Sequence, residues 1–137
     1  MTDETNLEQL PSTSIDTWVY AYTPDPQKWR PLDYDRFGKW CVTRSSEAID
    51  AAWLKVVALV DAGHVVHAKA SGYHQARRFG GSYLICVYTT NWEDRTDVFR
   101  VREHLRAVGF IEELGYKRDA ETTAGVYATP DEWWYRA

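Results

Sequence analysis

A histidine and a lysine two residues apart are the sharpest chemical signal in the sequence. His67 and Lys69 lie in a stretch that alternates with small apolar residues, and side chains two apart on a strand point to the same face. An imidazole beside an ammonium group suits proton transfer, and it also suits holding a phosphate. If the protein is an enzyme, we expect Lys69 and His67 to be its catalytic residues. The alternative interpretation is a solvated strand face that happens to carry both.

Lysines next to aromatic residues give a second signal, which points to ligand binding. Lys39 precedes Trp40, and Lys117 follows Tyr116. A ring can stack on a base while a nearby cation contacts its phosphate, so the pattern predicts a site for a phosphorylated or nucleotide-like ligand. The alternative is that lysine stems lie along apolar surface at strand ends. The predicted ligand-binding residues are Lys39, Trp40, Lys69, Tyr88, Arg102, Lys117 and Thr122.

Metal and cofactor motifs are missing from the sequence. His64, His74 and His104 show no ligand spacing with one another, so we predict no metal site. There is no glycine-rich phosphate loop, and we expect no cofactor. Cys41 and Cys86 are also not in a metal-type spacing, and we expect both to be reduced and structural, as is typical of a cytoplasmic protein.

The stretch Ser82–Thr90 predicts the strand around which the other elements are arranged. It is apolar on both alternate sets of positions, which is typical of a strand buried on both faces. A helix is predicted after it, over 96–108, with Asp94 or Thr96 as its cap and Gly109 at its end. Its apolar positions recur at spacings of three and four and form one stripe: Val98, Val101, Leu105 and Val108.

The remaining elements are predicted from shorter patterns. A second helix should cover 47–62, capped by Ser45 or Ser46 and ended by Gly63. In the first strand, Trp18 should share one face with two tyrosines, and residues 133–135 should dock back onto the body. Residues 72–81 predict a mobile basic loop. Further strands are predicted at 16–22, 37–44, 64–71, 110–117 and 125–129.

These elements predict an α+β fold, with a curved, mostly antiparallel sheet and two main helices packed on one face. The other face should be open, polar and aromatic, and should hold the site. With 137 residues, the chain fits a single domain over 15–137 behind a disordered acidic tail at 1–14. Aromatic residues make up 15%, more than a small core usually needs, so some rings should line a cleft.

The charge balance limits the choice of partners. A formal net charge of -4 argues against a general nucleic-acid surface, and we expect no DNA partner. A local basic cleft is compatible with that value, so RNA or a phosphopeptide is a candidate partner. No apolar run approaches the length of a membrane span, and we expect a cytoplasmic protein.

Six sequence blocks carry a resemblance to a known family. Together they resemble the basophilic-leukaemia-expressed protein family from about Trp18 to Tyr127, and the block at 85–89 followed by the one at 97–101 is the most specific part. The resemblance implies a fold similar to that of the cap-binding translation initiation factors. The loop at 72–81 departs from the pattern. The blocks are Gly38–Trp40, Ala68–Ser71, Ile85–Thr89, Asp97–Val101, Tyr116–Asp119 and Thr122–Tyr127.

Three functions fit these signals. The leading hypothesis is a small binding domain for a phosphorylated or nucleotide-like ligand. Some short prokaryotic members of the family are labelled phosphothreonine-lyase-like, which implies an alternative: an enzyme that eliminates phosphate, with Lys69 as base and His67 as acid. The third is a protein-interaction module that uses exposed aromatic rings and no small ligand.

Overall fold

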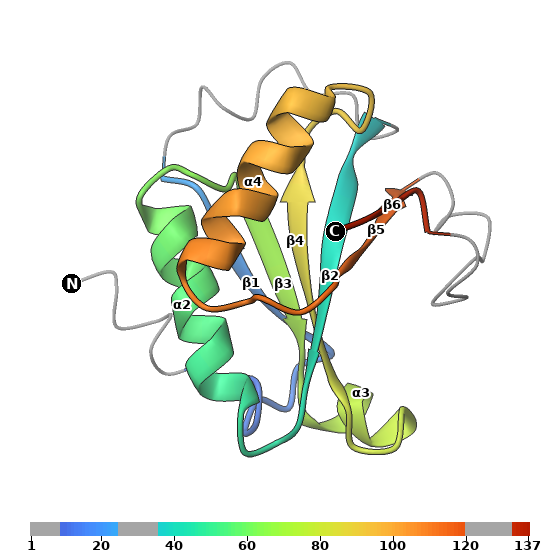
Figure 1. Cartoon of the computed structure of the whole chain (residues 1–137). Helices are drawn as coiled ribbons and strands as arrows, with labels where there is room; N and C mark the ends of the chain where they lie inside the picture. Colours follow the sequence, from blue (N-terminus) through green and yellow to red (C-terminus); the bar gives the residue numbers. More distant parts are fainter. Residues whose placement is uncertain (1–8, 25–35, 120–132) are drawn as a thin grey trace.

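The computed structural model describes residues 9–24, 36–119 and 133–137. Within them the chain forms six strands and three helices (Figure 1). The elements in order are β1 (Trp18–Tyr22), β2 (Gly38–Arg44), α2 (Ile49–Asp61), β3 (His67–Ser71), α3 (Tyr73–Arg78), β4 (Tyr83–Thr89), α4 (Arg95–Ala107), β5 (Gly115–Arg118) and β6 (Tyr135–Arg136).

All six strands belong to one sheet, in the order β1-β3-β4-β2-β5-β6. Every neighbouring pair is antiparallel. The apolar strand β4 lies between β3 and β2, as its two buried faces require, so the prediction of an interior strand is confirmed. The α+β fold class with a curved antiparallel sheet is confirmed as well.

Helices α2 and α4 cover the same face of this sheet (Figure 1). The predicted stripes form the core there, with Trp53 and Val56 of α2 and Val98 and Leu105 of α4 at most 1% exposed. The side chain of Asp94 accepts a hydrogen bond from the Asp97 N–H at 3.2 Å and caps α4 as predicted.

The end of each main helix lies beside a glycine with positive φ, but the start of α2 differs from the prediction. Gly63 (φ 84°) and Gly109 (φ 111°) follow α2 and α4, where this backbone conformation favours glycine. Helix α2 begins after Ala48, which makes no side-chain capping bond. The prediction of a serine cap at Ser45 or Ser46 was therefore wrong; a main-chain bond from Ala48 N–H to the Ser45 carbonyl forms the turn instead.

Several predicted boundaries need correction. Residues 73–78 form the short helix α3, not a mobile loop. Strand β3 begins at His67, and β5 covers only Gly115–Arg118. The strand predicted at 125–129 and residues 1–8 of the predicted tail lie outside the described residues. Ser12, in the second half of that tail, donates its N–H to the Asp50 carboxylate of α2 at 3.0 Å.

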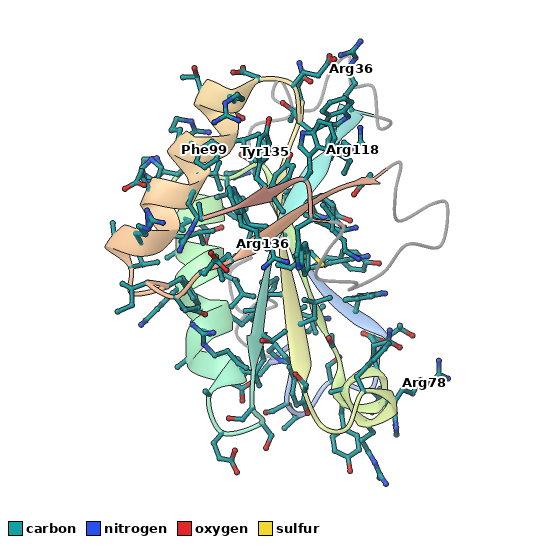
Figure 2. All side chains as sticks on the ribbon, turned by 45° about the vertical axis from the view of Figure 1, so that its right-hand side comes forward. Arg36, Arg78, Phe99, Arg118, Tyr135 and Arg136 are labelled. Atoms are coloured by element: carbon teal, nitrogen blue, oxygen red, sulfur yellow. The ribbon has the colours of Figure 1, made fainter. Side chains whose placement is uncertain are left out.

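The C-terminal segment docks on the body as predicted. Tyr135 of β6 faces Phe99 of α4, with ring centres 5.3 Å apart (Figure 2). Leu114 N–H donates to the main-chain oxygen of Ala137 at 2.8 Å. These contacts bring residues 133–137 beside β5. Among the described residues, none of the helices has both the length and the apolar character that crossing a membrane demands.

Candidate functional site

Strand register aligns side chains in rows on the sheet face that α2 and α4 leave uncovered. Tyr22 is opposite His67, His67 is opposite Tyr88, Tyr88 is opposite Lys39, and Lys39 is opposite Lys117. Because directly opposed residues share a face, these five side chains form one row, which we call the central row.

A second row runs beside it and carries different chemistry. Lys69 is opposite Cys86, Cys86 is opposite Cys41, and Cys41 is opposite Gly115. Gly115 pairs in turn with Arg136 of β6. The second row therefore places two thiols between a lysine and an arginine, in the middle of the sheet.

A cavity of about 300 Å³ lies over the second row and the adjoining loop before β5. Its lining holds four cationic side chains against two carboxylates, Glu112 and Glu113, and these glutamates pair with Arg44 at 2.5 Å and Arg136 at 3.7 Å. The cavity is thus locally positive in a chain whose net charge is -4. Its lining residues are Trp18, Lys39, Cys41, Thr43, Lys69, Leu84, Cys86, Glu112, Glu113, Leu114, Gly115, Lys117, Trp133 and Arg136.

Two tryptophans contact the lysines of this cavity. The Lys69 ammonium lies 4.0 Å from the centre of the Trp18 ring, and the Lys117 ammonium lies 5.1 Å from that of Trp133. The Trp133 indole rests directly on the backbone of Gly115, where an added Cβ would come within 2.3 Å of the ring. Only a glycine at this point of β5 lets that ring approach the sheet so closely.

Lys39 is held at the edge of the cavity by an ion pair. Its ammonium lies 3.2 Å from the Asp119 carboxylate and 5.6 Å from the centre of the Tyr88 ring. Burial acts to lower the pKa of Lys39, but the negative charges of Cys86 and Asp119 outweigh it and raise that pKa. Burial raises the pKa of Asp119. Lys39 is therefore a fixed cation that is already partly neutralised.

The predicted pair His67 and Lys69 shares a face, as expected, but only Lys69 lines the cavity. The His67 ring is stacked between Tyr22 and Tyr88, at 4.6 and 4.5 Å between ring centres. Burial, and then the charge of Lys69, lowers the pKa of His67 to about 4. Burial also lowers the pKa of Lys69. His67 is thus a neutral, packed ring at pH 7.

Two residues predicted to bind ligand lie on the wrong side of the sheet. Trp40 is fully buried beneath α4, where its Nε1–H donates to the Val98 carbonyl at 3.0 Å. Arg102 is also fully buried, and its guanidinium donates to main-chain oxygens of Ala137, Phe110 and Glu112 at 2.8, 2.9 and 2.6 Å. Both predictions were wrong, because the N–H groups of these side chains donate to main-chain oxygens in the interior of the protein.

The remaining predicted site residues have mixed outcomes in their placement. Lys39, Lys69 and Lys117 come together at the cavity. Tyr88 faces the same way, but it is 5% exposed and does not line the cavity. Thr122 lies outside the described residues.

The face itself is not open along its whole width, in contrast to the expectation. Tyr20 and Tyr22 of the edge strand β1 are 44% and 52% exposed, whereas Lys39 and Lys117 are 5% and 2% exposed. Pattern analysis missed Trp18, Trp133 and Asp119 as site residues. Trp18 carried a signal, because it alternates with the two tyrosines; the other two depend on long-range docking. In the described part of the chain, no three His, Cys, Asp or Glu side chains are grouped as a metal would need.

Comparison with known proteins places this geometry in a family and a fold. The model of the family "Basophilic leukemia-expressed protein Bles03" matches residues 36–125. Among solved structures, eIF4E-3 of C. elegans in complex with the 4E-binding protein Mextli is similar, with a TM-score of 0.66 and 13% identity over 100% of this chain and 81% of that chain. Schistosome eIF4E complexed with m7GpppG and 4E-BP gives 0.69 and 12% over 99% and 79%. At such identities the likeness shows the fold.

Proposed function

Since the chain belongs to the basophilic leukemia-expressed protein Bles03 family, we propose that it is a binding protein whose cavity takes the phosphate groups of a nucleotide-like ligand. The observation that carries this proposal is the convergence of Lys39, Lys69 and Lys117 on one cavity. Cations gathered in a hollow that is shielded from water attract phosphate more strongly than cations scattered over a surface.

The contacts of the three lysines suggest different roles. Lys39 is held by Asp119, so it fixes one side of the site. The ammonium groups of Lys69 and Lys117 lie against indole rings, and an ammonium group is a hydrogen-bond donor that suits phosphate oxygens. The rings of Trp18 and Trp133 would stack on the base of the nucleotide, because every base has a face on which an aromatic ring can stack. The similar Schistosome structure is a complex with the nucleotide m7GpppG, which agrees with this ligand class.

The lyase alternative has weaker support. Elimination needs a base that removes a proton from carbon and an acid that protonates the departing phosphate. Lys69, whose pKa burial lowers, suits the base. His67, with a pKa of about 4, is neutral at pH 7 and therefore a poor acid, and it is not part of the cavity lining. The geometry therefore favours binding over elimination.

Calorimetric titration of the full chain with GTP and with pyrophosphate tests the proposal. We expect Lys69→Gln and Lys117→Gln each to weaken binding by about tenfold, because a hydrogen bond to a charged group is worth about 1.5–3 kcal/mol. Lys55→Gln is the matched control, since Lys55 is exposed on α2 and is not among the residues that line the cavity. Equal loss in all three variants would contradict a specific site.

Two further outcomes would replace the proposal. Release of a dehydrated product from a phosphothreonine peptide, with loss of that product in Lys69→Arg, would establish the lyase instead, because arginine cannot act as the base. If neither anion binds, the proposal fails and the protein-interaction hypothesis takes its place. The similar eIF4E structures include complexes with 4E-binding proteins, which makes a peptide the first partner to test in that case.

A further inference from the structure

Two thiols lie side by side on the floor of the cavity. Cys41 of β2 and Cys86 of β4 are directly opposite in the strand register, and both line the cavity. Both cysteines are free in this structure. Opposed residues of an antiparallel pair have Cα atoms about 4.5 or 5.5 Å apart, and both distances lie within the range that a disulfide spans.

The charges around this pair favour a thiolate. The hydrogen bond from Cys41 lowers the pKa of Cys86 most, and the nearby ammonium groups of Lys39 and Lys69 lower it further, against the effect of burial. The same hydrogen bond and burial raise the pKa of Cys41. The two lysines thus favour the thiolate form of Cys86, and they would repel a metal cation.

We propose that Cys41 and Cys86 form a reversible dithiol site, which reacts with a small anionic disulfide entering the cavity and is converted to a cross-strand disulfide. Access is through the cavity, because Cys86 is only 1% exposed and Cys41 is half-buried. The cationic lining selects the charge of the reagent. The proposal does not depend on the phosphate ligand, since it needs only the two thiols and the charge around them.

The reaction proceeds in two balanced exchange steps. In the first, a protein thiolate attacks one sulfur of the small disulfide, the disulfide bond breaks, and one small thiolate leaves and takes up the proton released from the protein thiol. In the second, the other cysteine loses its proton to solvent and attacks the protein sulfur of this mixed disulfide, releasing a second small thiol. The protein dithiol is oxidised to a disulfide, and the small disulfide is reduced to two thiols.

The test compares two reagents of opposite charge on the reduced full chain at pH 7. Glutathione disulfide is anionic and cystamine is cationic, and both supply the same sulfur chemistry. After acid quenching and alkylation of remaining thiols, intact mass spectrometry should show a product lighter by two hydrogens that takes no alkylating groups. Electrostatic steering predicts that glutathione disulfide reacts at least about tenfold faster than cystamine.

Variants show whether the cavity causes this preference. Lys69→Gln should reduce the ratio of the two rates severalfold, whereas Lys55→Gln, on the exposed side of α2, should leave the ratio unchanged. Cys41→Ser should stop at the mixed disulfide on Cys86, the cysteine whose pKa is lowered, seen as the added mass of one glutathione less two hydrogens. Added dithiol reductant should return the wild-type product to the reduced mass.

Three results would overturn the proposal. One is a wild-type protein whose thiols are alkylated readily but form no internal disulfide with glutathione disulfide. Another is a cystamine rate equal to the glutathione disulfide rate. The third is a disulfide that links two chains and leaves no internal one. Each is independent of phosphate binding, so it would leave the proposed function untouched.

Discussion

The two faces of the sheet both pair an indole with a cation, and the pairs serve different purposes. On the helix face, the Arg102 guanidinium lies 5.9 Å from the Trp40 ring, and its N–H groups reach three main-chain oxygens. On the cavity face, the Lys69 ammonium lies 4.0 Å from the Trp18 ring, at the wall of a hollow. The guanidinium of Arg102 is bonded to main-chain oxygens within the fold, whereas the ammonium of Lys69 faces a cavity that has space for a ligand.

Residue type alone therefore does not mark a binding site. What separates the two faces is where the polar atoms find their partners. Guanidinium and indole N–H groups that donate to main-chain oxygens inside the protein are not available to a ligand. Substitution of such residues should therefore change stability and not binding. Cations that line a cavity should matter for binding and little for stability. Matched substitutions on the two faces test this division.

Trp40→Ala should have the largest effect. The indole is fully buried among Phe99 and Tyr116, at 5.6 and 5.1 Å between ring centres. Truncating such a ring typically lowers the free energy of unfolding by about 3–5 kcal/mol. Trp18→Ala, on the half-buried ring of the other face, should cost only about 1 kcal/mol. Urea unfolding followed by circular dichroism measures both, and equal costs would remove the distinction between the faces.

Arg102→Met should follow, with a loss of about 3 kcal/mol, because it leaves buried main-chain acceptors without donors. The matched change on the cavity face, Lys69→Met, should be neutral or slightly stabilising, because it removes a partly desolvated charge. In GTP titrations the order should reverse: Lys69→Met weakens binding, and folded Arg102→Met retains it. A stable Arg102 variant that has lost binding would show that Arg102 belongs to the site after all.

Strand alternation already held the information that separates Trp40 from Lys39. Neighbouring residues of a strand point to opposite faces, so the two could not both reach one ligand. The sequence prediction grouped them by adjacency and was wrong for that reason. The same alternation, applied to β3, predicted correctly that His67 and Lys69 face away from the helices.

Other parts of the site could not be predicted from local pattern. Arg102 lies among the charged residues of the helix pattern that became α4. Nothing near it in the sequence indicates that the main-chain oxygen of Ala137, 35 residues away, would accept its hydrogen bond. The contact between Cys41 and Cys86 depends on pairing β2 with β4 across three intervening elements. The fold class was predictable because periodicity is local, whereas the cavity was not, because it is made by register and docking.

His67 should give a pH dependence of stability. Its folded pKa of about 4 lies below the unfolded value of about 6.5. Between these values the unfolded chain binds a proton that the folded chain does not. The contribution of His67 to the free energy of unfolding should therefore be complete above about pH 6.5, and the free energy of unfolding should fall by roughly 2–3 kcal/mol as the pH is lowered to 4. Below pH 4 this group contributes no further change.

The measurement is urea unfolding from pH 7 to pH 4 on three proteins. His67→Phe keeps a ring between Tyr22 and Tyr88 and should lose most of the difference from pH 7 to pH 4. His74→Gln, on exposed α3, should behave as wild type. If wild type and His67→Phe have the same pH profile, His67 is charged or solvated in the folded state, and the central row is not a packed layer.

Gly115→Ala should have the smallest effect and the most selective one. The new Cβ would displace the Trp133 ring from the cavity wall without touching the charge of any lysine. If Trp133 stacks on a base, the affinity for GTP should fall by about fivefold, roughly 1 kcal/mol, at the lower end of measured base stacking. The affinity for pyrophosphate, which has no base, should stay within twofold in the same calorimetric titrations. Equal losses for both ligands would show that the ring acts by positioning Lys117, which lies 5.1 Å from it, and not by contacting the ligand.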